Sequence, residues 1–139
     1  MEPAGTFHLI GNTGLHIEHQ FDDEGALSIW FYGDLVVKQG DRFDRYLGHL
    51  EGLQQLLDDS SATHIHCHLE HLGEVLSRGQ HAIYRMLHAM RDQGCAITIY
   101  ATREYPAQSE HLNMSRLFVN GLSKHPGPPV KLIEVRQAS

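Results

Sequence analysis

The stretch HIHCHLEH, residues 64–71, decides what kind of sheet this chain can form. Side chains of a β-strand alternate between its two faces. If the stretch begins a strand, its first three histidines share one face: His64, His66 and His68. Its apolar residues share the other face: Ile65, Cys67 and Leu69. The apolar set suits a hydrophobic core, so the histidine set must face water or a partner.

Two other strand-like stretches show the same division. In LSIWFY, residues 27–32, aliphatic or Phe positions alternate with Ser, Trp and Tyr, and in AITIYA, residues 96–101, Ile alternates with Thr and Tyr. Strands covered by helices on both faces are usually almost continuously apolar. These strands are not, so we expect an α/β fold whose mixed sheet carries helices mainly on one face, with the other face polar and at least partly open.

The helices are predicted from apolar residues that recur every three or four positions. Such stripes predict helices over residues 41–59 and 77–93, and Gly94 is well placed to end the second one. Pro106 interrupts the chain after the next strand. We expect a shorter helix over residues 110–122.

The remaining segments complete a single domain over residues 1–139. Two strands around the turn sequence DDEG predict an N-terminal hairpin at about residues 15–36. Three prolines make a loop of residues 123–129, which precedes a last strand, VKLIEV. The predicted order is β-β-α-β-α-β-α-β, with the hairpin as the antiparallel part of the sheet and crossover helices joining parallel strands.

Composition argues against several classes of partner. The formal net charge is -6 and no basic stripe stands out, so nucleic acid is not favoured. No apolar run approaches the ~20 residues that cross a bilayer, and the first residues lack the features of a signal peptide, so we expect no membrane partner. The two cysteines lie in apolar runs and imply no disulfide framework, which favours the cytoplasm.

The histidine cluster raises the question of a metal. Zinc is bound by imidazole and thiolate, so His64, His66 and His68 are the residues that could hold one. Zinc sites usually take further ligands from a separate segment, and the chain has neither a CxxC nor an HExxH motif. A polar open sheet face is the simpler interpretation, and we expect no cofactor.

Two stretches resemble the STAS domain, the fold of bacterial anti-sigma factor antagonists. In the first, residues 27–50, a strand ends in Gly33-x-Leu35 shortly before a helix. In the second, residues 68–103, Ser77-Arg78-Gly79 opens a helix as the S-x-G signature of the family does. The resemblance covers about residues 26–136 and extends to the SiaC-type STAS-like biofilm regulators. Leu76 and His68 stand where the family has Asp.

The resemblance implies a non-enzymatic bacterial signalling protein, an anti-anti-sigma-like regulator. Its partner would be a kinase or an anti-sigma-like protein, and Ser77 would be the phosphorylation site. A helix start suits a phosphate because it offers unpaired amides and a partial positive charge. Serine is also a preferred helix cap, so capping alone is the alternative role. The expected partner-binding surface lies around this serine: Leu72, Gly73, Glu74, Val75, Arg78, Gly79 and His81.

Two other functions compete with this one. An enzyme could draw on the histidines, Cys67 and Glu70, but Cys67 should point into the core and no nucleophile elbow or phosphate loop is present. The open face with Trp30, Tyr32, His66 and Tyr100 could instead make the chain a homodimer, or a metal-binding module through its histidines.

Overall fold

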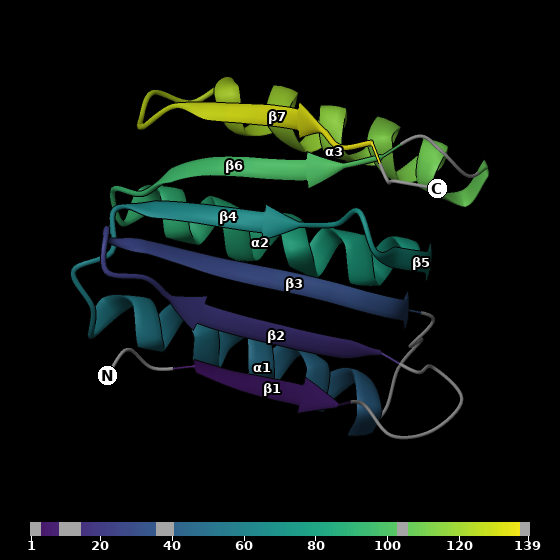
Figure 1. Cartoon of the computed structure of the whole chain (residues 1–139), viewed down its shortest axis with the longest axis horizontal. Coiled ribbons are helices and arrows are strands. Elements are labelled where there is room, and N and C mark those ends of the chain that lie inside the picture. Colours follow the sequence, from purple (N-terminus) through teal and green to yellow (C-terminus); the bar gives the residue numbers. More distant parts are fainter. Residues whose placement is uncertain (1–3, 9–14, 36–40, 103–105, 137–139) are drawn as a thin grey trace.

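The computed structural model describes residues 4–8, 15–35, 41–102 and 106–136. Over these residues it is a mixed α/β domain with one seven-stranded sheet and three helices. The sheet order is β1-β2-β3-β4-β6-β7, and β5 pairs with the far end of β3. In Figure 1 the three helices lie behind the sheet, so the strands are seen from their other face.

The antiparallel part of the sheet consists of β1 (Ala4–His8), β2 (His16–Phe21) and β3 (Ala26–Leu35). The turn between β2 and β3 is closed by Asp22, whose Oδ1 accepts hydrogen bonds from the amides of Glu24 (2.8 Å) and Ala26 (3.0 Å). Such Asx turns explain why Asp and Gly cluster in DDEG. The predicted hairpin is therefore present, except that its last residue, Val36, falls outside the described residues.

The parallel part of the sheet joins β3 to β4 (His64–His68), β6 (Ala96–Ala101) and β7 (Val130–Glu134). The crossovers contain α1 (Asp41–Asp58), α2 (Ser77–Asp92) and α3 (Pro106–Ser123). Residue Gly94, after the end of α2, has a φ of 100°, a conformation that favours glycine. α3 begins at Pro106 rather than at residue 110, because proline is tolerated in the first turn of a helix.

The structure contains two strands that the predicted order lacks. β1 is a short edge strand, and β5 (Leu72–Val75) lies between β4 and α2, where the predicted order has no strand. β5 pairs parallel to β3 through Gly33 and Leu35. The observed order is therefore β-β-β-α-β-β-α-β-α-β. β1 pairs with the next strand, β2, whereas β5 is held by pairing with the distant β3, which local alternation does not reveal.

The core lies between the sheet and the helices, and the burial of each strand alternates. Ile65 and Cys67 of β4 are fully buried, whereas its three histidines are partly exposed. The same holds for β3, whose inward side chains are Leu27, Ile29 and Phe31. The helices contribute the other half of the core through apolar stripes, as in α2: Ala82, Ile83, Met86, Leu87 and Met90.

One buried charge fastens the C-terminal half of the fold. The guanidinium of Arg91, which is 8% exposed, donates hydrogen bonds to the carbonyls of Pro128 (2.7 Å), Leu122 (2.7 Å) and His125 (3.0 Å). Arg91 thereby ties the end of α2 to the end of α3 and to the proline-rich connection before β7. A buried cation is tolerable here because carbonyl oxygens surround it.

We predict that Arg91→Met destabilises the fold by about 3 kcal/mol, because carbonyls that now accept charged hydrogen bonds lose their donor. Urea denaturation measures the change. Arg85→Met is the matched control, since Arg85 is exposed on the same helix, and its effect should stay within about 0.5 kcal/mol. Equal effects of the two substitutions would contradict the role given to Arg91.

A pair of histidines lies at the other side of the domain. His19 of β2 and His49 of α1 have ring centroids 6.3 Å apart, and His19 is 9% exposed. Gly5 of β1 makes room for this pair, because a Cβ at Gly5 would lie 2.7 Å from the ring of His19. Burial lowers the pKa of His19. Burial, with a smaller contribution from His19, lowers the pKa of His49 to about 4.

Both histidines therefore make stability fall on acidification. Their pKa values in the unfolded chain are near ~6.5, so the unfolded state takes up protons first as the pH drops below that value, and stability is lost down to about pH 4. We expect the melting temperature of the native protein to fall between pH 7 and pH 5. The fall should be on the order of 5 °C smaller in the double variant His19→Gln, His49→Gln, which lacks both groups. Identical pH slopes would contradict this role.

Candidate functional site

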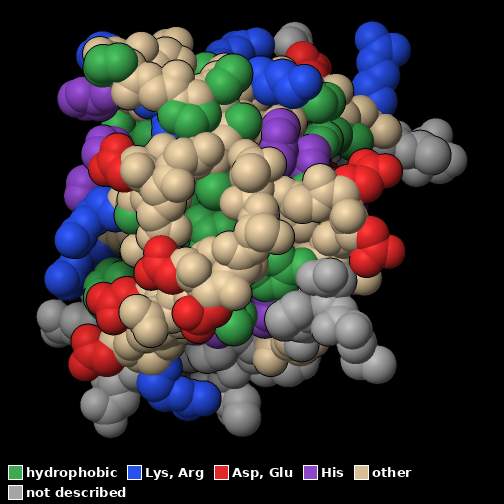
Figure 2. All heavy atoms as spheres, turned by 90° about the vertical axis from the view of Figure 1, so that its left-hand side faces the viewer, with side chains coloured by type: hydrophobic (Ala, Val, Ile, Leu, Met, Phe, Trp, Pro, Cys, Tyr) green, Lys and Arg blue, Asp and Glu red, His purple; other side chains and the backbone are tan. Residues whose placement is uncertain are grey.

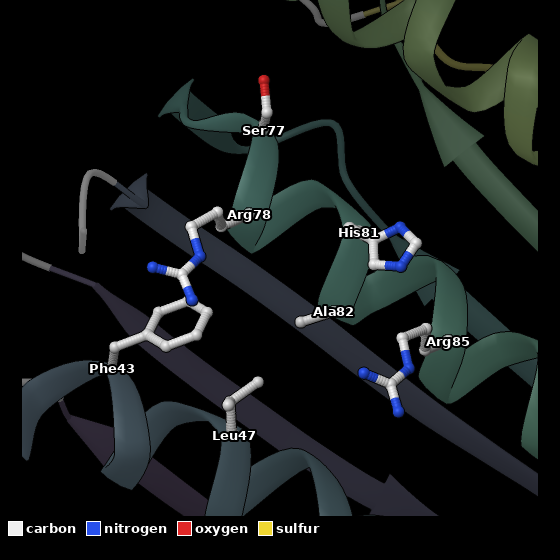
Figure 3. A pocket seen from close by; sticks show the side chains of 7 residues that line it. All are labelled: Phe43, Leu47, Ser77, Arg78, His81, Ala82 and Arg85. Carbon is white, nitrogen blue, oxygen red and sulfur yellow. The ribbon is translucent and has the colours of Figure 1, made fainter. Parts of the chain in front are cut away.

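The first candidate site is the start of α2. The helix begins at Ser77, its N-cap residue is Leu76, and no side chain caps it. Ser77 is exposed. Figure 3 shows its side chain at the end of the helix, with the hydroxyl directed away from the neighbouring residues. Ser77 is therefore the first residue of the helix and does not act as its cap.

A groove of about 500 Å³ runs beside this serine, between α1 and α2 (Figure 3). Its walls are apolar where α1 contributes Phe43 and Leu47, and cationic where α2 contributes Arg78 and Arg85. The guanidinium of Arg78 lies 5.1 Å from the centroid of the Phe43 ring, within the range of a cation–π contact. His81 and Ala82 complete the lining.

Helical spacing explains the arrangement on α2. Ser77, His81 and Arg85 follow each other at intervals of four residues, so they lie along one line of the helix surface. The groove wall on α1 is held in place by Tyr46, whose hydroxyl donates a buried 2.9 Å hydrogen bond to the carbonyl of Gly79. This bond fixes the first turn of α2 against α1.

The segment that leads into Ser77 is tied down by β5. The Oδ1 of Asp34, at the end of β3, accepts a 2.9 Å hydrogen bond from the amide of Glu74. A Cβ on Gly73 would overlap the Asp34 carboxylate, so a larger residue there would displace this side chain and its hydrogen bond. The approach to Ser77 is therefore a paired strand with a defined position.

The residues expected to bind a partner fall into two groups. Arg78, His81 and Glu74 are exposed, but Leu72 and Gly79 are buried and offer no side-chain surface. The side chain of Val75 lies outside the described residues, and Leu76 is half-buried. Sequence reasoning missed four groove residues: Phe43, Leu47, Ala82 and Arg85. The four-residue spacing from His81 could have indicated Arg85, whereas Phe43 and Leu47 depend on how α1 docks against α2.

The second candidate site is the sheet face opposite the helices, which we call the ring face. Its rings include Trp30, Tyr32, His64, His66, His68, Tyr100 and, on β2, His16. The ring of His68 is stacked between those of Trp30 and Tyr100, with centroids 5.1 Å and 4.2 Å away. The rings of Tyr32 and His71 stack in the same way at 5.1 Å.

Each histidine of β4 has a hydrogen-bonding neighbour within the domain. His64 Nε2 lies 2.7 Å from Thr98 Oγ1, and His66 Nδ1 lies 2.8 Å from the Tyr100 hydroxyl. His68 Nδ1 donates to Glu70 Oε1 at 2.9 Å. Within the described part of the chain, no group of three or more His, Cys, Asp or Glu side chains could hold a metal ion.

Two histidines of the ring face, His64 and His66, are neutral near pH 7. Burial lowers the pKa of both His64 and His66, and the charge of Lys131 acts in the same direction. The carboxylates of the ring face lie toward its margins: Glu18 on β2, and Glu70 beyond the end of β4, where it is only 6% exposed.

The two cysteines lie apart from both candidate sites. Cys67 is fully buried and Cys95 is 2% exposed. Burial, followed by the nearby Glu70 carboxylate, raises the pKa of the Cys67 thiol, and burial raises the pKa of the Cys95 thiol. A thiol with a raised pKa is a poor nucleophile.

We expect both thiols to react with Ellman's reagent about 100-fold more slowly in the native protein than in the urea-unfolded protein, which serves as the control. The absorbance of the released thionitrobenzoate measures both rates. One thiol that reacts rapidly in the native protein would contradict this prediction and would restore Cys67 or Cys95 as a candidate nucleophile.

No protein-family model, curated protein or solved structure matches the chain. The likeness to STAS domains therefore rests on the sequence motifs around Gly33 and Ser77. Among the described residues, no helix is both long and apolar enough to cross a membrane.

Proposed function

We propose that this chain is a non-enzymatic regulatory protein of STAS-like fold that binds a protein partner at the groove and helix start around Ser77. The observation that carries the proposal is an exposed, non-capping hydroxyl at the first residue of α2, beside a groove of about 500 Å³. A serine that does not cap its helix is available to another molecule.

The lining of the groove supports a particular kind of partner. Phe43 and Leu47 offer an apolar wall, and Arg78 and Arg85 place two cations at its edge. A partner segment that combines an apolar anchor with acidic side chains would match both features. The positive charge that would attract such a partner is confined to the groove, because the chain as a whole has a net charge of -6.

Several exposed acidic side chains lie at the other end of the domain, although Asp34 and Glu74 lie close to the start of α2. Figure 2 shows the end of the domain where β3, β4 and β6 begin, with acidic groups spread over its lower part. Exposed acids gather in two segments that meet there: Asp22, Asp23, Glu24, Asp58 and Asp59. The start of α2 lies at the opposite end of the sheet (Figure 1).

Phosphorylation supplies a physical switch for this site. A partner kinase would transfer the γ-phosphoryl group of ATP to the Ser77 oxygen, which loses its proton, and ADP would leave. The product carries about two added negative charges at pH 7. The helix start and the neighbouring Arg78 favour that charge, so the helix would persist. The cationic edge of the groove would be neutralised, and an acidic partner segment would be released.

The STAS resemblance supports the class of partner, a kinase or an anti-sigma-like protein. In that family the hydroxyl at the position of Ser77 is the one that such a partner modifies. The deep burial of Cys67 supports a role without catalysis, because it removes the strongest nucleophile of the chain from solvent.

We expect Ser77→Asp to weaken capture of the partner from cells that contain this protein by at least about tenfold relative to Ser77→Ala and the native protein, because the carboxylate opposes an acidic segment. Quantitative mass spectrometry of the captured proteins measures the change. Arg85→Glu should have the same effect without touching the serine.

Ser61→Asp is the matched control, because Ser61 is also exposed but precedes β4 at the other end of the domain. It should leave capture unchanged. Recovery of the same partners in equal amount by Ser77→Asp, Ser77→Ala and the native protein would overturn the switch. Loss of partners with Ser61→Asp as well would show that added charge, and not its position, decides binding.

A further inference from the structure

The ring face is built from rows of side chains that cross the sheet. Strand registers align Glu18, Trp30, His68, Tyr100 and Ile133 in one row from β2 to β7. The next row runs through Gln20, Ser28, His66, Thr98 and Lys131. β4 is the middle strand of the five, and its histidines form the centre of the face.

The rings in the first row stand upright on the sheet. His68 and Tyr100 are nearly parallel, at 7°, with centroids only 4.2 Å apart. Two rings lying flat and side by side could not approach so closely, so they stack along the row, whose strands are about 4.8 Å apart. Ring edges therefore point outward. Such a surface is unsuited to stacking on flat nucleic-acid bases, which need exposed ring faces, but it can meet a similar surface of ring edges.

The β2 and β7 ends of these rows carry opposite charges, and the edge strand β1 lies outside β2. Glu18 on β2 has a side chain that is 43% exposed, although its Oε1 lies 3.2 Å from His16 Nε2. On β7, Lys131 is exposed, and its neighbour Ile133 is 37% exposed. The β2 side of the rows is thus acidic and the β7 side is basic and apolar, with the rings of Trp30, His68 and Tyr100 between them.

We propose that the ring face is a self-association surface whose partner is a second copy of this chain, related by a two-fold axis that runs along β4. Rotation about such an axis places β2 of one copy over β7 of the other. Glu18 then faces Ile133 and lies one row from Lys131 of the second copy, within reach of the lysine side chain. The contact occurs twice, and aligned packing of this kind is common between sheets.

The size of the face sets the strength of the dimer. Two rows across five strands and a shorter third row through Ala26, His64 and Ala96, with strands about 4.8 Å and rows about 6.7 Å apart, cover roughly 400 Å² on each copy. Stable interfaces bury about 800 Å² per partner. The dimer is therefore weak, and sedimentation velocity from about 10 μM to about 1 mM covers the range where it forms.

Charge reversal tests the symmetry directly. Glu18→Lys alone places two lysines at each of the two marginal contacts, and Lys131→Glu alone places two glutamates there. Each single variant should weaken dimerisation by about tenfold or more. An equimolar mixture of the two single variants should dimerise again. Positions 18 and 131 are both basic in the first variant and both acidic in the second. Each of the two contacts in the mixed dimer therefore pairs opposite charges.

Trp30→Ala should also weaken the dimer, whereas Leu117→Ser is the matched control, because Leu117 is 69% exposed on α3, away from the ring face. A native chain that remains monomeric at about 1 mM would overturn the proposal, and so would a dimer that persists in both charge variants or is lost only with Leu117→Ser. The assay needs no partner at Ser77, so its failure would leave the groove proposal untouched.

Discussion

The register of β4 is the constraint on which the rest of the structure depends. Because side chains alternate along a strand, a slip of one residue would move His64, His66 and His68 into the core and expose Ile65 and Cys67. Burying three imidazoles without partners would cost more than this small domain could offset. Pairing with β3 on one side and β6 on the other holds the register from both directions.

This register also places the groove. It brings the ends of β3 and β4 together, so that β5 can pair with β3 and carry the chain directly to the first turn of α2. The Tyr46–Gly79 hydrogen bond then sets that turn against α1. The position of Ser77 follows from two non-local contacts, one through the sheet and one through the helices.

Features that depend on neighbouring residues could be predicted from the sequence, and features that depend on distant ones could not. The alternation in HIHCH and the four-residue periodicity of α2 are local, and both indicated the correct element. β5 has only four residues, too few for alternation to identify it, and its pairing depends on the distant Gly33. The same reason hid Phe43 and Leu47 from the predicted site, since only packing of α1 on α2 makes them neighbours of Arg78.

The two proposed surfaces lie on different sides of the domain, and this separation has a consequence for regulation. The groove is formed by α1 and α2, which lie behind the sheet in Figure 1, whereas the ring face is in front. A dimer through the ring face would leave both grooves accessible and would hold them at a fixed separation. A partner that is itself dimeric would then bind with a high effective concentration at the second groove. Phosphorylation of one Ser77 would remove the partner's contact with that groove and also the high effective concentration at the other groove. Binding of a dimeric partner would therefore respond more steeply to phosphorylation than binding to a monomer.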